Sequence, residues 1–206
     1  MVTGTYTGDA VDGRAIDIGF APALVIVTSG ASSRAPYMRT SSMTGDTSYQ
    51  LDGGAGAANA IESLNAQGFT VGTRDQVNAA AELYHYVAFK EVAGFVEVGS
   101  YTGTADVQDI PVSFQPRTVI VRRHGSSSSS STAWRNEAMP KQQSMHLAGG
   151  KPLVDEIQYF SRDGFSIGGS AFVNANGGVY HWVAFGSGGC GNGVKDPGEA
   201  CDGNDF

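Results

Sequence analysis

The chain has few cysteines and few charges, and both shortages exclude classes of protein. Only two of the 206 residues are cysteines, Cys190 and Cys201, and the 189 positions before them have none. Two cysteines are too few for a disulfide framework, although they allow one local bridge near the C-terminus. Charged residues make up 16% of the chain, against about 25% on average, while 41% are hydrophobic, which excludes a charge-rich disordered chain.

Long apolar runs and basic clusters are also missing. No stretch approaches the roughly 18 apolar residues of a membrane-spanning helix, so we expect no membrane insertion. The first residues lack the basic and apolar regions of a signal peptide, which indicates a mature product, a fragment or a chain exported by another route. The formal net charge is −7, which would repel phosphate backbones, so we expect no nucleic-acid partner.

Glycine is abundant, with 29 residues, and the chain contains one unit twice. GTYTG at Gly4–Gly8 returns as GSYTG at Gly99–Gly103, and YHYVAF at Tyr84–Phe89 returns as YHWVAF at Tyr180–Phe185. Three further matches keep the same order at an offset of 94 to 96: GFAPALVIV with SFQPRTVIV, AQGFTVG with RDGFSIG, and Asn78 with Asn174. The pattern indicates a tandem duplication of a unit of about 95 residues, which is long enough for a small domain.

Each copy has the pattern of short strands, because β-branched and aromatic runs alternate with Gly, Asp and Pro. Only Ala57–Leu64 and Pro152–Phe160 are candidates for a helical turn or two, and neither has the cap-to-cap pattern of a helix. The sequence therefore predicts an all-β chain of two tandem β-sandwiches, of jelly-roll or immunoglobulin-like type. The predicted domains are residues 1–90 and 95–186, followed by a cysteine-rich C-terminal tail over residues 187–206.

No catalytic or metal-binding pattern stands out. The chain has no G-x-S-x-G turn, no H-x-x-x-H or C-x-x-C spacing and no phosphate-binding glycine loop. His85 and His181 occupy the same place in the two copies, on an apolar strand, which favours hydrogen-bonded core residues over catalysts. Glycosidase-type carboxylate pairs stay open, but acids kept in only one copy indicate solvated surface unless that copy has specialised. We expect no enzyme, no metal and no cofactor.

Aromatic residues are the best candidates for ligand contact, because their rings can stack on sugars. Those that recur in both copies, such as Tyr6 and Tyr101, are predicted to form a shared core. Three aromatic residues without a counterpart, Tyr37, Tyr49 and Trp134, are the predicted surface contacts.

The repeated motifs resemble a known kind of module. G-x-Y-T-G, G-F-x-P-x-x-V-x-V, G-F-x-[VI]-G and Y-H-[YW]-V-A-F together are similar to a β-rich repeat of phage tail-fibre and virion-surface proteins and of some secreted bacterial proteins. The resemblance spans most of residues 2–186, and copy two departs from it at Ser113, where the motif has glycine. It implies an extracellular, cell-surface or virion-surface structural role with receptor or glycan contact.

The C-terminal residues resemble a different repeat. CGNGVKDPGEACDGND at Cys190–Asp205 is similar to the cysteine-rich repeat in surface and secreted proteins of myxobacteria and related bacteria. This resemblance implies an exported protein in an oxidising compartment, where a Cys190–Cys201 bridge would persist. The acidic residues of the segment lack the spacing of a calcium loop and are predicted to form a solvated tail.

The function predicted from these features is that of a non-enzymatic, extracellular structural protein that forms or decorates a surface assembly or filament. Exposed strand edges would join the chains into a homo-oligomer or polymer. The alternative is an adhesin or tail-fibre module that binds a surface glycan or receptor, with the two copies adding avidity.

Overall fold

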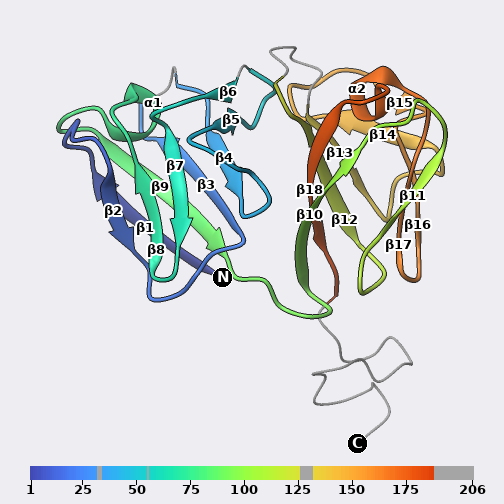
Figure 1. Ribbon diagram of the computed structural model, residues 1–206, viewed down its shortest axis with the longest axis horizontal. Helices are drawn as coiled ribbons and strands as arrows, with labels where there is room; N and C mark the ends of the chain where they lie inside the picture. The colour runs from blue at the N-terminus through green and yellow to red at the C-terminus, as the bar shows by residue number, and fades with distance from the viewer. Residues whose placement is uncertain (32–33, 55, 126–131, 188–206) are drawn as a thin grey trace, which may run out of the picture. The chain divides into compact units, whose positions relative to one another are not determined.

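The computed structural model describes residues 1–31, 34–54, 56–125 and 132–187, and their regular secondary structure is almost entirely β-strand (Figure 1). The chain divides into two compact units. Unit 1 is Met1–Lys90 with His124–Thr132, and unit 2 is Glu91–Arg123 with the residues from Ala133 onward, in each case as far as they are described.

Unit 1 consists of two antiparallel sheets, as expected for a β-sandwich. The larger has the strand order β1-β9-β3-β4-β5-β6, with β1 (Val2–Thr7), β3 (Leu24–Ser29), β4 (Tyr37–Thr40), β5 (Ser48–Gln50), β6 (Gly56–Ala57) and β9 (Leu83–Phe89). The smaller has the order β2-β8-β7, with β2 (Arg14–Asp17), β7 (Ile61–Asn65) and β8 (Gly68–Val71). A four-residue helix, α1 (Asp75–Asn78), connects β8 to β9.

Unit 2 repeats this arrangement strand for strand. Its larger sheet has the order β10-β18-β12-β13-β14-β15, with β10 (Val96–Thr102), β12 (Thr118–Arg123), β13 (Thr132–Asn136), β14 (Gln143–His146), β15 (Leu153–Val154) and β18 (Val179–Phe185). Its smaller sheet has the order β11-β17-β16, with β11 (Gln108–Pro111), β16 (Ile157–Ser161) and β17 (Gly164–Ile167). The helix α2 (Ala171–Asn174) matches α1, which supports the duplication read from the sequence.

The core of each unit lies between its two sheets. In unit 1, Val25 and Val27 of β3 belong to one buried cluster with Ile16 of β2 and Phe69 of β8. Most of the repeated aromatic residues are confirmed as core: Phe20, Tyr86 and Tyr101 pack against the clusters, whereas Phe89 and Phe185 are half-buried outside them. The buried ones are Tyr6, Phe69, Tyr84, Phe114, Phe165, Tyr180 and Trp182.

The G-x-Y-T-G motif has a packing reason in both copies. Gly4 of β1 lies opposite Tyr86 of β9, and Gly99 of β10 lies opposite Trp182 of β18. A Cβ atom on Gly4 would come within 2.3 Å of the Tyr86 ring hydroxyl, and one on Gly99 within 2.5 Å of the Trp182 ring. Each glycine therefore leaves the space that a cross-strand aromatic ring fills.

The helix prediction was wrong in position. Both predicted segments, Ala57–Leu64 and Pro152–Phe160, contain strands, and the helices lie instead at α1 and α2. In each copy a β-bulge interrupts the pairing of this segment, between Ile61 and Ser63 and between Ile157 and Tyr159. A bulge breaks the alternation of buried and exposed residues, which removes the strand signature from the sequence.

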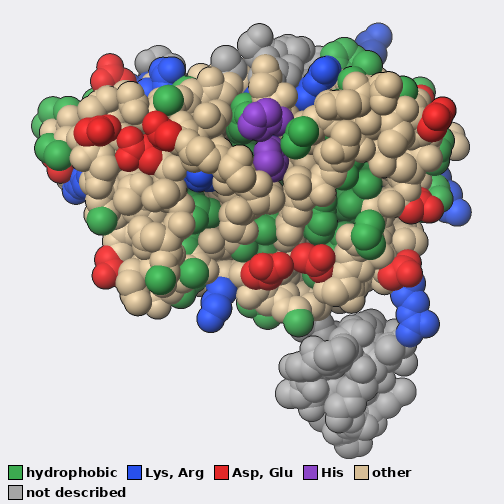
Figure 2. All heavy atoms as spheres, in the orientation of Figure 1, with side chains coloured by type: hydrophobic (Ala, Val, Ile, Leu, Met, Phe, Trp, Pro, Cys, Tyr) green, Lys and Arg blue, Asp and Glu red, His purple; other side chains and the backbone are tan. Residues whose placement is uncertain are grey.

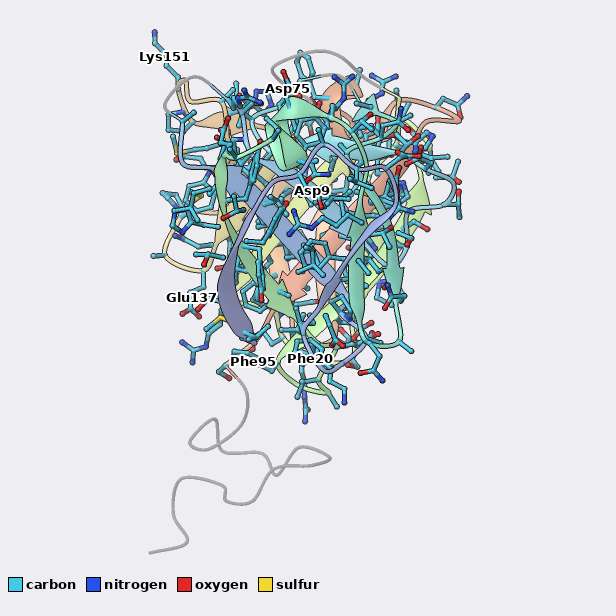
Figure 3. All side chains as sticks on the ribbon, turned by 90° about the vertical axis from the view of Figure 1, so that its left-hand side faces the viewer. Asp9, Phe20, Asp75, Phe95, Glu137 and Lys151 are labelled. Carbon is cyan, nitrogen blue, oxygen red and sulfur yellow. The ribbon has the colours of Figure 1, made fainter. Side chains whose placement is uncertain are left out.

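The helices are too short to be held by their own backbone and are fixed by buried side chains. Neither helix has a side-chain N-cap hydrogen bond. The hydroxyl of Tyr6 donates to the carbonyl of Val77 in α1, and that of Tyr101 donates to the carbonyl of Val173 in α2, both over 2.5 Å. In unit 1, Asp75 at the start of α1 lies at the opposite end from Phe20 (Figure 3).

A left-handed backbone position after each helix provides an internal test of strain. Ala81 has φ = 61°, and the matching Gly177 has φ = 73°, with open space where a Cβ atom would lie. Left-handed backbone costs a non-glycine residue about 1–2 kcal/mol, partly offset by the greater freedom of unfolded glycine. We expect Ala81→Gly to raise the free energy of unfolding by about 0.5–1 kcal/mol, measured by urea denaturation followed by circular dichroism.

The matched control for this change is Ala80→Gly, because Ala80 is exposed and does not have positive φ. It should lower the free energy of unfolding by about 0.5–1 kcal/mol, the usual cost of added chain entropy. Equal effects of the two substitutions would show that the backbone at Ala81 is not strained.

Two further predictions concern the C-terminal tail and membrane insertion. Cys190 and Cys201, with the tail over residues 187–206, lie outside the described residues apart from Ser187, so their pairing stays a prediction. Within the described ranges, no helix has the length and apolar character needed to cross a membrane.

Candidate functional site

Two of the three predicted surface aromatics are buried, which corrects that prediction. Tyr37 is 2% exposed and Tyr49 is 1% exposed, whereas Trp134 is half-buried. Tyr37 faces the sandwich core from β4, and the Tyr49 ring on β5 occupies the space beside Gly56, where a Cβ would come within 2.4 Å. Neither tyrosine ring therefore presents an open face on which a ligand would stack.

The repeated histidines differ between the copies. His181 on β18 is 4% exposed, as predicted for a buried residue, although it is not part of the core cluster, whereas His85 on β9 is exposed. His85 alternates with the core residues Tyr84 and Tyr86, so its side chain points away from the core. The prediction of a buried histidine was therefore wrong for copy one.

A buried asparagine joins the helix to the neighbouring loops in both copies. The side-chain oxygen of Asn174 accepts hydrogen bonds from the backbone nitrogen of Thr104 (2.8 Å) and from Gln108 (2.7 Å). Its nitrogen donates to the carbonyls of Asp106 (2.6 Å) and Gly168 (2.8 Å). Asn78 makes the matching contacts in unit 1, and both residues are fully buried. Since both copies keep these bonds, their role is structural.

A buried arginine organises the turn after β4 and after β13. Arg39 donates to the carbonyls of Thr47 (2.7 Å) and Gly45 (2.6 Å), and Arg135 donates to those of Pro140 (2.7 Å) and Met139 (2.9 Å). Desolvation lowers the pKa of the Arg39 guanidinium below its ordinary value, with nearby Asp46 and Tyr49 opposing the change. The sequence does not show that Arg39 and Arg135 correspond, because the loops around them differ between the two copies.

Acidic side chains gather on the face of unit 1 that carries β7 and β8 (Figure 2). Burial raises the pKa of the Glu62 carboxyl, and the neighbouring Asp12 and Asp46 add to the rise. Among the described residues, no group of three or more His, Cys, Asp or Glu side chains is arranged to hold a metal ion. The carboxylates of Glu62, Asp12 and Asp46 therefore repel one another, and they are not arranged as a metal site.

Unit 2 contains a buried histidine–glutamate pair that unit 1 lacks. The Nε2 atom of His146 lies 2.8 Å from an oxygen of Glu156, and the hydroxyl of Ser144 donates to the other oxygen over 3.1 Å. The side chains of His146 and Glu156 are 8% and 1% exposed. The carboxylate lies between the hydroxyl and the imidazole, whereas a catalytic triad needs the imidazole between the nucleophile and the acid. This group is therefore a packing feature.

The surface of unit 2 carries a shallow pocket of about 280 Å³ on the outer face of its smaller sheet. We call it the outer pocket; its lining residues are Asp109, Ile110, Pro111, Tyr159, Ser161, Asp163 and Gly164. The Tyr159 ring is 38% exposed, and both aspartates are exposed. The alternating residues Ile110 and Phe165 point the other way, into the core. The pocket thus stands on a rigid, well-packed sheet.

Strand register shows which pocket residues are new in copy two. Asp109 and Tyr159 flank Ser166 on neighbouring strands, so the three side chains form one row on the outer face. The matching row of unit 1 is Ala15, Thr70 and Ser63. Asp163, in the turn before β17, stands where unit 1 has Gln67. A small, neutral row has therefore become an aromatic and acidic one.

Ser166, at the centre of this row, has lost its partner. In unit 1 the hydroxyls of Ser63 and Thr70 are hydrogen-bonded to each other over 2.8 Å. In unit 2, Tyr159 replaces the serine, and the Ser166 hydroxyl is fully buried without a hydrogen-bond partner. A buried polar group that lacks a partner costs free energy, about 1–3 kcal/mol. Such a group calls for a specific explanation, because buried polar groups in native structures are nearly all hydrogen-bonded.

The sequence contains a signal for this pocket, but only in the differences between the copies. Tyr159 is an aromatic residue without a counterpart, like Tyr37 and Tyr49, but its segment has no strand pattern and is a candidate for a helical turn. Asp109 and Asp163 are acids kept in one copy only, which is the pattern expected where one copy has specialised.

Comparison with known proteins places the chain in a family. A family model described as "Domain of unknown function (DUF7483)" matches residues 2–189, so the chain belongs to that family. No curated protein and no solved structure matches the chain. The family description names neither a tail-fibre module nor a myxobacterial repeat, and those resemblances stay predictions.

Proposed function

We propose that this protein binds carbohydrate through the outer pocket of unit 2. The observation that carries the proposal is the row of Asp109, Ser166 and Tyr159, which replaces a small, neutral row in the duplicate. Two copies of one fold differ here by an exposed ring, two carboxylates and an unsatisfied hydroxyl. Drift of a solvated surface would not be expected to leave a buried hydroxyl without a partner.

The size and chemistry of the pocket suit a sugar. Its volume of about 280 Å³ is near the lower end of the roughly 300–1,000 Å³ of small-molecule pockets, so it admits about one ring. A sugar presents C–H groups on one face and hydroxyls around its rim. The negative face of the Tyr159 ring attracts the C–H face, while Asp109 and Asp163 accept hydrogen bonds from hydroxyls.

The same geometry favours binding over hydrolysis. Glycoside hydrolysis needs one carboxyl group sheltered in apolar surroundings so that it keeps a proton to give to the leaving group. Asp109 and Asp163 are both exposed. The proposal is therefore a lectin-like contact without chemistry on the sugar, in agreement with the non-enzymatic role predicted from the sequence.

The test is Tyr159→Ser, which gives unit 2 the residue that unit 1 has at this position. The change should leave the fold intact, because Ser63 is already tolerated in the duplicate, and Ser166 regains a hydroxyl partner. Wild-type protein on an array of neutral, acidic and amine-bearing oligosaccharides identifies the ligands. Calorimetry should then show binding weakened about tenfold or more, since the loss of about 1.4 kcal/mol of ring contact is a factor of ten.

Val154→Ala is the matched control. Val154 is an exposed hydrophobic residue of unit 2, 67% accessible, and it does not line the pocket. Its affinity should equal that of the wild type. The proposal fails if no oligosaccharide binds the wild type, or if Tyr159→Ser binds as tightly as the wild type does.

Assembly through strand edges is a second candidate, and the sheet order favours it. β1 and β10 are the end strands of the larger sheets, and neither contains lysine or proline. Natural proteins commonly protect exposed edges with such residues, so the edge of β1, and that of β10 beyond the Val92–Val96 bridge, are the candidates for pairing with another chain. On this proposal the protein builds or decorates a filament at a cell or virion surface, and the predicted Cys190–Cys201 bridge belongs to the same extracellular setting.

Sedimentation over a range of about a hundredfold in concentration separates the two candidates. Assembly through β1 or β10 predicts species that grow with concentration, and Thr5→Pro in β1 should reduce them because proline removes an edge hydrogen bond. A protein of constant mass that still binds oligosaccharide supports the binding function alone.

A further inference from the structure

The outer pocket has a pronounced charge asymmetry. Among the described residues, neither Asp109 nor Asp163 forms an ion pair with a lysine, arginine or histidine. Asp163 accepts one hydrogen bond, from the hydroxyl of Ser161 over 3.2 Å. Some other acids of the molecule do have a cationic partner, as Glu137 has in Arg117 over 2.7 Å. The pocket thus presents two carboxylates without a cation among its lining residues.

The polar groups of the pocket need donors from a ligand. The two carboxylates only accept hydrogen bonds, and the Ser161 hydroxyl already donates its hydrogen bond to Asp163. A protonated amine has three donors and no acceptor, which complements this set, whereas an acidic group would meet only repulsion.

The aromatic ring adds to the same preference. A cation over the face of a tyrosine ring is attracted by the negative charge of that face. Tyr159 and Asp109 are both direct cross-strand neighbours of Ser166, so a ring substituent that contacts Tyr159 is within reach of the Asp109 side chain. The ring and the carboxylates therefore favour one ligand together: a sugar that carries a positive charge.

We infer that the outer pocket selects glycans with free, protonated amino groups over N-acetylated, neutral and acidic glycans. The inference rests on the proposed carbohydrate-binding function and names the class of sugar. The N-acetylated form keeps the ring and all of its hydroxyls but loses the charge and two of the three N–H donors. Selectivity between these two forms thus isolates the contribution of the carboxylates.

The experiment compares a glucosamine tetramer with the N-acetylglucosamine tetramer on wild type and on the variant Asp109→Ala/Asp163→Gln. These substitutions give unit 2 the residues of unit 1, Ala15 and Gln67, so the variant is expected to fold. Calorimetry should show that wild type binds the glucosamine tetramer at least about tenfold more tightly than the N-acetylglucosamine tetramer. In the variant the preference should disappear: the amine tetramer should lose at least about tenfold in affinity, whereas the acetylated tetramer, which loses only uncharged hydroxyl contacts to the carboxylates, should lose less.

Added salt and a peptide of four lysines complete the test. Salt should weaken binding of the amine tetramer and leave the acetylated one unchanged, because only the first contact is between charges. The inference is overturned if wild type binds both tetramers equally, if the variant keeps the preference, or if tetralysine binds as tightly as the amino sugar. If wild type binds both tetramers equally and Tyr159→Ser weakens that binding, the proposed carbohydrate-binding function stands and only the selectivity fails. If no sugar binds, the proposed function and the selectivity both fail.

Discussion

Replacing Asn174 with alanine is expected to lower the free energy of unfolding of unit 2 by about 3–5 kcal/mol. The residue is fully buried and makes four hydrogen bonds, to Thr104, Asp106, Gln108 and Gly168. Each group left without a partner costs about 1–3 kcal/mol when it stays away from water. Partial hydration of the loops reduces the sum, but the loss remains a large part of the roughly 5–15 kcal/mol that a domain has.

The measurement is urea denaturation followed by tryptophan fluorescence. The two tryptophans of the chain, Trp134 and Trp182, lie on β13 and β18 of unit 2, so the signal reports this unit directly. Asn176→Ala is the control, because Asn176 is two residues away and exposed, and it should change stability by less than about 0.5 kcal/mol. A loss below about 1 kcal/mol for Asn174→Ala would mean that water replaces the asparagine in full.

Local sequence patterns determine a large part of this fold but not its long-range contacts. The duplication, the strand-rich character and the aromatic core all follow from motifs in which residue type and packing agree, as in Tyr84 and Tyr180. Asn78 and Asn174 match as a pair in the sequence, but their hydrogen bonds reach residues up to 70 positions away. Contacts of that range follow from the topology, which local patterns do not specify.

The wrong predictions have local causes. The bulges at Ile61 and Ile157 hide two strands, and four-residue helices are too short to show a helical period. Tyr37 and Tyr49 were expected on the surface because copy two lacks them, yet a residue unique to one copy is as free to fill that copy's core. Absence of a counterpart indicates specialisation only where the side chain is also exposed.

The outer pocket meets that stricter criterion. Tyr159, Asp109 and Asp163 are exposed, unique to copy two and adjacent in the sheet, and only the strand register brings them together. In the sequence, Asp109 and Tyr159 are 50 residues apart and lie in unrelated motifs. The correspondence between the two units also supplies the test substitutions. Replacing a residue of unit 2 with the one found at the same place in unit 1 is the change least expected to disturb the fold.

The His146–Glu156 pair carries the second large prediction. Replacing His146 with leucine, which has a similar volume, leaves the Glu156 carboxylate buried with only the Ser144 hydroxyl as a partner. Removing one member of a buried ion pair typically costs about 3–5 kcal/mol, because the remaining charge is uncompensated. We expect a loss of about 3–5 kcal/mol in the free energy of unfolding, again followed by tryptophan fluorescence in urea.

The double variant His146→Leu/Glu156→Gln distinguishes the charge from the packing. Glutamine keeps the shape of Glu156 and a hydrogen bond to Ser144 while removing the charge, so about 2 kcal/mol or more of the loss should return. Unit 1 shows that the fold does not require the pair, since Gln50 and Ala60 stand at the matching positions, 96 residues earlier. A double variant no more stable than His146→Leu would assign the whole loss to packing around the imidazole. Recovery would instead show that the Glu156 carboxylate depends on its imidazole partner, in a place where the duplicate folds with an uncharged pair.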